Sequence, residues 1–376
     1  MNVKYLPFGD TGINVSNLGF GCMRLPMIEK DGKEIVNDEL AIPLLQKAVD
    51  LGINFFDSHW FYCNYDSQRV VGKALRDVRD QVYISTKIPM WLVTKTEDFF
   101  DFLERALEQM GLEYLDFYHL PHLSYPEWRD KILPLKLLDE AEKAKSKGLI
   151  KHLSFSFHSD VDKMHELIDT GAFSTVMGQY NLADMKNEGL FAYAKEKGLG
   201  TLAMVPLMGG VLSEGGQAFL DLMESDYATA TELGLRFVWS QPNIDVLLSG
   251  MSSIPQLEEN ISYANDGKEM TAVTRQKLIY RAHAVNALDD LYCTDCRYCF
   301  ECPEGIPVGM VFTYYLQHHV WGLTDAIRAR RGKDGLYNLS KLPSACTSCG
   351  HCVKRCPQKI DIPKQLERVW DVLQNL

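Results

Sequence analysis

Short apolar runs alternate with amphipathic stretches from residue 17 to residue 263. The apolar runs are rich in β-branched and aromatic residues, which predicts eight strands, over 17–23, 54–58, 82–88, 115–120, 151–157, 175–181, 200–207 and 245–251. The intervening stretches have helical periodicity. One covers 38–52 and begins at a capping Asp38, and another covers 101–111 and is closed by Gly111.

Several of these strands are apolar on both faces, as parallel strands covered by helices must be. Eight such β-α units predict a (β/α)₈ TIM barrel. A doubly wound sheet is the alternative, but no G-x-G-x-x-G motif follows any strand. Residues 4–16 predict a hairpin around a glycine turn, which would plug the N-terminal end of the barrel.

The composition limits the size, location and partners of the protein. A chain of 376 residues with 46% hydrophobic residues can form one large and one small domain, and we place them at 1–283 and 284–376. A net charge of -11 argues against nucleic acid or an anionic membrane as the partner. No apolar run reaches the length of about 18 residues that a membrane span needs. Because the N-terminal residues also lack a signal-peptide pattern, we expect a cytoplasmic protein.

Eight of the ten cysteines form two groups near the C-terminus. The members of the groups are Cys293, Cys296, Cys299 and Cys302, and Cys346, Cys349, Cys352 and Cys356. Three cysteines at x₂ spacing followed by Cys-Pro are typical of bacterial ferredoxins, which predicts a small, helical ferredoxin-like domain with two [4Fe-4S] clusters. A zinc site would instead have two separated CxxC pairs. In ferredoxins the fourth cysteine often binds the other cluster, so the spacing leaves the assignment of Cys302 and Cys356 open.

Three ionisable residues stand where a barrel places its catalytic groups, at the C-terminal ends of strands. Asp57 ends the second predicted strand, Lys87 ends the third, and Tyr62 lies in the loop after Asp57. A lysine ammonium lowers the pKa of a neighbouring phenol, which enables a tyrosine to donate a proton near neutral pH. A structural ion pair with a nearby tyrosine would have the same spacing, so the pattern alone leaves both interpretations open.

Longer segments resemble the aldo/keto reductase family in order and spacing. They are LGFGCMRLP, FFDSHWFY, ISTKIP, YLDFYHL, GLIKHLSFSFH, QYNLAD, PLMGG and SGMSSIPQLEEN. With the cysteine-rich tail, the chain resembles the iron–sulfur branch of that family. The resemblance implies a reductase that uses NAD(P)H on a small carbonyl or alcohol substrate, through an Asp–Tyr–Lys–His tetrad. It places Asp57, Tyr62 and Lys87 in this tetrad, with Tyr62 as the proton donor.

The chain departs from the family at several tetrad and cofactor positions. The tetrad histidine falls on Pro121, so we expect the next residue, His122, to contact substrate and His119 to pack lower in the barrel. The Ser-Asn pair that holds the nicotinamide amide is Ser156-Phe157 here, and the partner glutamine falls on Met177, with Gln179 two residues on. The tyrosine that stacks on the nicotinamide is replaced by Met204, while His59 is expected to shape the pocket together with Trp60.

The remaining contacts to the cofactor are also implied by the resemblance. The loop after the eighth strand supplies Gly250 and Ser252 for the pyrophosphate, together with Gln256, while Glu259 and Asn260 match adenine contacts. Gly21, Met23, Leu207 and Gly209 are expected beside the cofactor as well. Because the loop has no lysine or arginine for a 2′-phosphate, we expect NADH to be preferred over NADPH.

Three functions are compatible with these residues. The first is a carbonyl reductase whose clusters exchange electrons with a redox protein partner. In the second, the barrel works alone as a reductase and the clusters are structural or redox-sensing. In the third, the barrel has lost nicotinamide chemistry and the protein transfers electrons or senses redox state.

Overall fold

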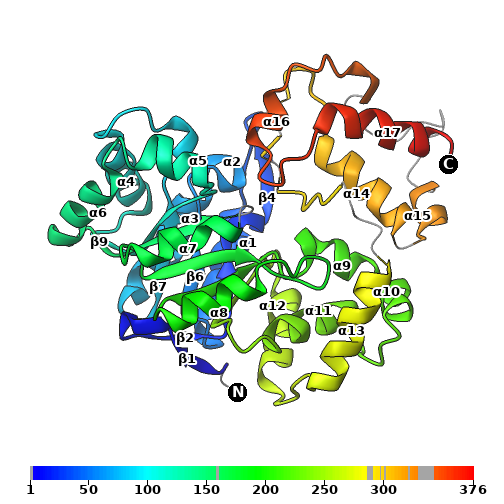
Figure 1. Cartoon of the computed structure of the whole chain (residues 1–376), viewed down its shortest axis with the longest axis horizontal. Helices are drawn as coiled ribbons and strands as arrows, with labels where there is room; N and C mark the ends of the chain where they lie inside the picture. The colour runs from blue at the N-terminus through cyan, green and yellow to red at the C-terminus, as the bar shows by residue number, and fades with distance from the viewer. Residues whose placement is uncertain are drawn as a thin grey trace. The chain divides into compact units, whose positions relative to one another are not determined.

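The computed structural model describes residues 3–157, 161–285, 291–296, 298–299, 302–320, 322–328 and 343–376 (Figure 1). Eight parallel strands close into a barrel in the order β3-β6-β7-β8-β9-β10-β11-β12. Their bounds are β3 Leu18–Gly21, β6 Phe55–Asp57, β7 Tyr83–Lys87, β8 Leu115–Leu120, β9 Ile150–Phe157, β10 Thr175–Gln179, β11 Gly200–Met204 and β12 Val246–Ser249. Each lies within a predicted run or begins one residue before it, so the eight strands and the TIM-barrel prediction are confirmed.

A helix follows every barrel strand. These are α1 Asp38–Asp50, α3 Ser67–Leu75, α4 Asp98–Met110, α6 Leu137–Ser146, α7 Val161–Asp169, α8 Glu188–Glu196, α11 Ala230–Trp239 and α12 Ile254–Asn265. The predicted cap of α1 is wrong, because Asn37 is the N-cap and accepts a hydrogen bond from the Glu39 N–H. Asp38 instead binds Arg69, 2.7 Å away.

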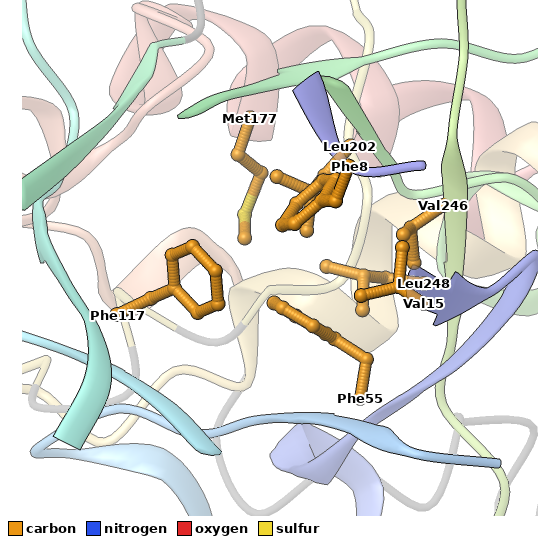
Figure 2. Packing of buried hydrophobic residues seen from close by; sticks show 8 residues of the cluster. All are labelled: Phe8, Val15, Phe55, Phe117, Met177, Leu202, Val246 and Leu248. Atoms are coloured by element: carbon orange, nitrogen blue, oxygen red, sulfur yellow. The ribbon is translucent and has the colours of Figure 1, made fainter. Parts of the chain in front are cut away.

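The N-terminal hairpin forms as predicted, from β1 (Tyr5–Pro7) and β2 (Asn14–Ser16). Its Phe8 and Val15 are fully buried at the N-terminal ends of the strands. Figure 2 shows their side chains converging with those of Phe55, Phe117, Met177, Leu202, Val246 and Leu248. Only glycine fits at position 200, because a Cβ added to Gly200 would lie 2.5 Å from the ring of Phe8. The plug therefore fills the end of the barrel opposite the predicted active site.

A second hairpin, β4 (Met27–Lys30) with β5 (Lys33–Val36), follows the first barrel strand and was not predicted. Its turn residues Asp31 and Gly32 both have positive φ, 53° and 73°. Asp-Gly is the preferred pair in a two-residue turn of this kind, so the dipeptide was an available signal.

The chain forms two compact units. The first comprises Met1–Tyr180, Asp184–Met204 and Val238–Glu269, and the second comprises Asn181–Ala183, Val205–Phe237 and Met270–Leu376. The boundary predicted after residue 283 lies in the last turn of α13 (Ala272–Val285). Helix α14 packs against α17 in the second unit.

The remaining helices and turns complete the described structure. The other helices are α2 Tyr62–Tyr65, α5 Tyr125–Glu127, α9 Val211–Glu214, α10 Gly216–Leu222, α14 Val308–His319, α15 Thr324–Arg328, α16 His351–Arg355 and α17 Ile362–Gln374. The short 3-10 or π turns are η1 Gly9–Thr11, η2 Cys22–Arg24, η3 Arg76–Gln81, η4 Met90–Leu92, η5 Trp128–Ile132, η6 Met208–Gly210 and η7 Pro343–Ala345.

Candidate active site and cluster cavities

A buried ion pair lies at the C-terminal ends of β6 and β7. The Lys87 Nζ is 2.6 and 2.5 Å from the two carboxylate oxygens of Asp57 and 3.0 Å from the carbonyl oxygen of Ser58. Each charged side chain is only 4% exposed. Burial lowers the pKa of Lys87, and the adjacent Asp57 carboxylate acts in the opposite direction. The three N–H donors of Lys87 are thus all occupied, and its charge is held in place.

Strand alternation explains why these side chains meet inside the barrel. Phe55 lies in the plug core, and Asp57, two residues further along the same strand, points to the same interior face. Lys87 is in register with His119 of β8, so these two side chains enter the barrel from neighbouring strands. Ser85 donates a hydrogen bond to Asp57 at 2.8 Å, which fixes the carboxylate further.

Tyr62 is presented by a strained turn. The Lys87 Nζ lies 5.3 Å from the centroid of the Tyr62 ring. The next three residues, Cys63, Asn64 and Tyr65, have φ of 53°, 54° and 69°, a left-handed backbone that costs about 1–3 kcal/mol per non-glycine residue. Hydrogen bonds hold this turn. The Cys63 thiol donates to the Met23 carbonyl oxygen at 3.4 Å, and the Gln109 side-chain amide donates to the Tyr65 carbonyl oxygen at 2.7 Å. Strain of this kind is typical of functional sites.

Three histidines surround the ion pair. Burial, followed by the nearby Lys87 charge, lowers the pKa of His122 to about 3. The same two causes, in the same order, hold the pKa values of His59 and His119 well below the usual range. All three imidazoles are therefore neutral at physiological pH. His119 is fully buried in β8, as expected, and His122 follows that strand with a left-handed φ of 56°.

The predicted nicotinamide contacts lie at two levels of the barrel. Ser156 is 2% exposed and accepts hydrogen bonds from the N–H groups of His122 and Leu123. Gln179 ends β10 with no exposed surface, and neither atom of its amide has a hydrogen-bond partner among the described residues. Met177 packs in the plug core instead. A buried amide without a partner fits a polar ligand such as the nicotinamide carboxamide.

The predicted phosphate loop lies at the start of α12. Ser252 donates from its hydroxyl to the Arg24 carbonyl oxygen at 2.8 Å, and its N–H donates to Gln256 at 2.8 Å. A Cβ added to Gly250 would lie 3.6 Å from Cβ, Cγ and Cδ of Arg24. Sequence reasoning did not find this arginine, because 226 positions separate it from Gly250 and no local pattern links the two. The carbon chain of an arginine therefore packs beside a loop that contains no cation of its own.

The other predicted contacts are distributed over both units. Asn260 is buried and donates to the Ser249 hydroxyl at 3.1 Å, whereas Glu259 accepts from Tyr263 at 2.8 Å. Gly21 ends β3 in register with Asp57, and Met23 lies in η2. Leu207 and Gly209 belong to η6 and its N-cap in the second unit. Trp60, expected in the pocket, packs edge-on against Phe102 of α4, with ring centroids 5.5 Å apart.

The cysteines line two cavities in the second unit. The first cavity is lined by Cys293, Cys296, Cys299 and Cys356. The second is lined by Cys302, Cys346, Cys349 and Cys352. Each cavity thus has three cysteines of one sequence group and the fourth cysteine of the other. No three side chains of His, Cys, Asp or Glu in the described ranges converge on a single metal ion.

Electrostatic contacts agree with this division of the cysteines. Burial, then the neighbouring Cys356 thiol and, to a smaller extent, the Cys352 thiol raise the pKa of the Cys299 thiol to about 12. Burial also raises the pKa of Cys356, while the backbone N–H groups of Ile360, Gln358 and Lys359 lower it through hydrogen bonds to its sulfur. N–H groups that point at cysteine sulfur are typical of iron–sulfur sites. The donor set and its surroundings therefore fit a [4Fe-4S] cluster in each cavity.

Comparison with known families identifies both parts of the chain. Residues 17–275 match the aldo/keto reductase family, and residues 292–360 match the 4Fe-4S dicluster domain. The first match covers well over half of the chain, so the protein belongs to the aldo/keto reductase family. It is an oxidoreductase of that family with an attached 4Fe-4S dicluster domain. The domain implies two clusters, and the family implies NAD(P)H and a small carbonyl substrate.

Individual relatives agree with this assignment. L-galactose dehydrogenase from Arabidopsis thaliana is 26% identical over 69% of this chain and 88% of its own length. The aldo-keto reductase YhdN of Bacillus subtilis is 26% identical over 56% of this chain and 64% of its own. Aldo-keto reductase AKR11C1 from Bacillus halodurans superimposes with a TM-score of 0.64 at 22% identity, over 74% of this chain and 96% of its own, which shows the shared fold.

No described helix combines the length and the apolar character needed to cross a bilayer.

Proposed function

We propose that the barrel reduces a small carbonyl compound with NAD(P)H, or oxidises the corresponding alcohol, with Tyr62 as the proton donor. The observation that carries this proposal is the buried Asp57–Lys87 pair, with the Lys87 Nζ 5.3 Å from the Tyr62 ring centroid. A charged lysine fixed beside a tyrosine, inside a site of neutral histidines, is suited to acid catalysis near neutral pH.

Each member of the site has a separate task. Tyr62 donates its hydroxyl proton to the carbonyl oxygen, and the Lys87 ammonium stabilises the phenolate that remains. Asp57 holds Lys87 charged and oriented, because both of its oxygens accept from Nζ. His122, in the turn after β8, contacts the substrate. A nicotinamide cofactor held at this site would supply the hydride. Burial of these groups keeps water away and strengthens their electrostatic interactions.

We further propose that Gln179 and Ser156 hold the nicotinamide amide and that Gly250 and Ser252 contact the pyrophosphate. Within the first unit, the cofactor contacts also include Gln256, Glu259, Asn260, Gly21 and Met23, whereas the contacts expected of Leu207 and Gly209 in the second unit stay predictions. The loop itself has no cation, and on that ground NADH was expected to be preferred. Arg24, whose side-chain carbons lie beside Gly250, is a cation from another segment that could contact a phosphate there.

Arg24 is therefore assigned to the cofactor phosphates. Arg24→Ala should weaken NADPH binding about tenfold and NADH binding less, measured by fluorescence titration. Unchanged affinity for both cofactors would remove Arg24 from the site.

Replacement of the proton donor tests the reductase proposal. Tyr62→Phe removes one oxygen and little volume, so nicotinamide binding should persist while the rate of carbonyl reduction falls about 10²–10⁴-fold. Tyr65→Phe is the matched control, because Tyr65 lies three residues away in the same turn and is 44% exposed. A wild-type protein that binds neither NADH nor NADPH would instead favour an electron-transfer or redox-sensing role.

For the C-terminal region we propose two [4Fe-4S] clusters for electron transfer with a redox protein partner, in a reducing compartment such as the cytoplasm. Cys293, Cys296, Cys299 and Cys356 bind one cluster, and Cys302, Cys346, Cys349 and Cys352 bind the other. Anaerobically purified protein should contain about eight iron atoms and eight sulfides.

The assignment of the fourth ligands has a direct test. Cys356→Ser and Cys296→Ser should alter the same cluster signal in electron paramagnetic resonance spectra, and Cys302→Ser should alter the other. If Cys356→Ser and Cys352→Ser alter the same signal instead, each sequence group binds its own cluster.

A further inference from the structure

His59 is a buried imidazole with one nitrogen left without a partner. Its side chain has no exposed surface. The Phe61 N–H donates to its Nδ1 at 3.3 Å, so Nδ1 is the acceptor of the ring. Because the ring is neutral, its proton is on Nε2. Nε2 has no hydrogen-bond partner within the part of the chain that the structure describes.

The imidazole is fixed by the rings around it. It stacks on Trp91 at a centroid distance of 5.5 Å and an interplanar angle of 16°, and Phe61 meets it edge-on at 4.5 Å. The ring of Tyr62 lies 5.2 Å away. Lys87, His119 and His122 are close enough to affect the protonation of His59. The unpaired N–H group therefore belongs to the same site as the proposed proton donor.

Among the described residues the ring nitrogens of His119 also lack partners, but it is the His59 ring that lies 5.2 Å from the ring of Tyr62. The three N–H groups of Lys87 donate to the two carboxylate oxygens of Asp57 and to the Ser58 carbonyl oxygen. Position 121, where the family has its histidine, is a proline and has neither a side-chain donor nor a backbone N–H. A buried N–H group without a partner is unfavourable, so such a group in a native site indicates a ligand that completes it.

We propose that the His59 Nε2–H group donates a hydrogen bond to the substrate, at an oxygen on the carbon next to the reacting carbonyl. This inference rests on the proposed reductase function. Tyr62 serves the carbonyl oxygen itself, so the neighbouring neutral donor is available for a second oxygen. His59 therefore makes the site selective for carbonyl compounds that are oxygenated beside the carbonyl.

A pair of probes that differ in one hydroxyl tests the proposal. The ratio of kcat/KM for 2-hydroxypropanal to that for propanal is measured on the anaerobic holoenzyme and its variants. Comparing ratios between variants cancels the intrinsic reactivity of each aldehyde. His59→Phe keeps a ring against Trp91 but removes the donor, and should lower the ratio about 3- to 10-fold, the value of one neutral hydrogen bond. His59→Gln retains a donor and should restore part of the ratio.

Two controls separate this proposal from the one on which it rests. Trp60→Phe changes the adjacent ring, which packs on Phe102, and should leave the ratio unchanged. Tyr62→Phe should abolish the reduction of both probes. If His59→Phe leaves the ratio within about twofold of wild type while Tyr62→Phe is inactive, the reductase function stands and the role of His59 is refuted. If the wild-type holoenzyme reduces neither probe, the reductase proposal itself fails.

Discussion

Replacing Lys87 with Met should destabilise the barrel strongly. The change removes the cation that lies 2.5–2.6 Å from both oxygens of Asp57 and leaves a carboxylate that is 4% exposed. One hydrogen bond, from Ser85 at 2.8 Å, then remains to that carboxylate. Removing one partner of a buried pair typically costs about 3–5 kcal/mol, and we expect a loss of that size at pH 7.

Equilibrium urea unfolding followed by tryptophan fluorescence measures this loss. Lys73→Met is the matched control, because Lys73 pairs with Asp38 at 2.9 Å but is 51% exposed, and it should cost about 1 kcal/mol or less. The double variant Asp57→Leu/Lys87→Met should recover most of the stability, since no buried charge is left unpaired. A loss below about 1 kcal/mol in Lys87→Met, or a double variant as unstable as the sum of its single changes, would refute the reasoning.

The remaining predictions concern packing and pH. Phe8→Ala should lower the free energy of unfolding by about 3–5 kcal/mol in urea titrations, because the fully buried Phe8 ring fills the plug. Gly72→Ala would place a Cβ 1.9 Å from the Met110 carbonyl oxygen and should lower the melting temperature, whereas Gly189→Ala enters open space in a helix and should not. Because the pKa of His122 is lowered to about 3, the unfolded chain binds the extra proton below pH 6.5. Stability should therefore fall by about 1.4 kcal/mol per pH unit from this group as the pH drops from 6 to 5, and His122→Gln should remove that part of the slope.

The features that sequence predicted well are local or set by strand alternation. All eight barrel strands are apolar runs bounded by turn residues, and parallel strands covered on both faces leave little ambiguity. Asp57 and Lys87 end consecutive strands, which are neighbours in a barrel, so their meeting followed from the topology. The eight cysteines were recognised because cluster ligands lie at short fixed spacings.

The features that sequence missed depend on contacts between distant segments. Asn and Asp are equally good N-cap residues. Asn37 is the N-cap here because Asp38 forms ion pairs with Arg69 and Lys73. Arg24 reaches Gly250 only after the barrel closes. The spacing left the partners of Cys302 and Cys356 open, because they depend on how the two sequence groups fold over each other.

The left-handed backbone after Tyr62 also had little signal, since Asn64 is a type that tolerates this conformation but Cys63 and Tyr65 are not. Tertiary contacts such as that of Gln109 with Tyr65 impose this conformation. The sequence also could not predict that the Nε2 of His59 has no hydrogen-bond partner among the described residues, because many side chains could have bonded to a histidine near the pocket.

In the proposed function, the barrel transfers hydride directly to the substrate, while the clusters exchange electrons with a separate redox partner. The most direct test is to run the carbonyl reduction in ordinary water with NADH or NADPH that carries deuterium at the transferable C4 position, and to locate the label in the alcohol by mass spectrometry and NMR. The account predicts one deuterium on the carbinol carbon of the product. A product whose carbinol hydrogen comes entirely from water would contradict it, because the electrons would then have reached the substrate without hydride transfer.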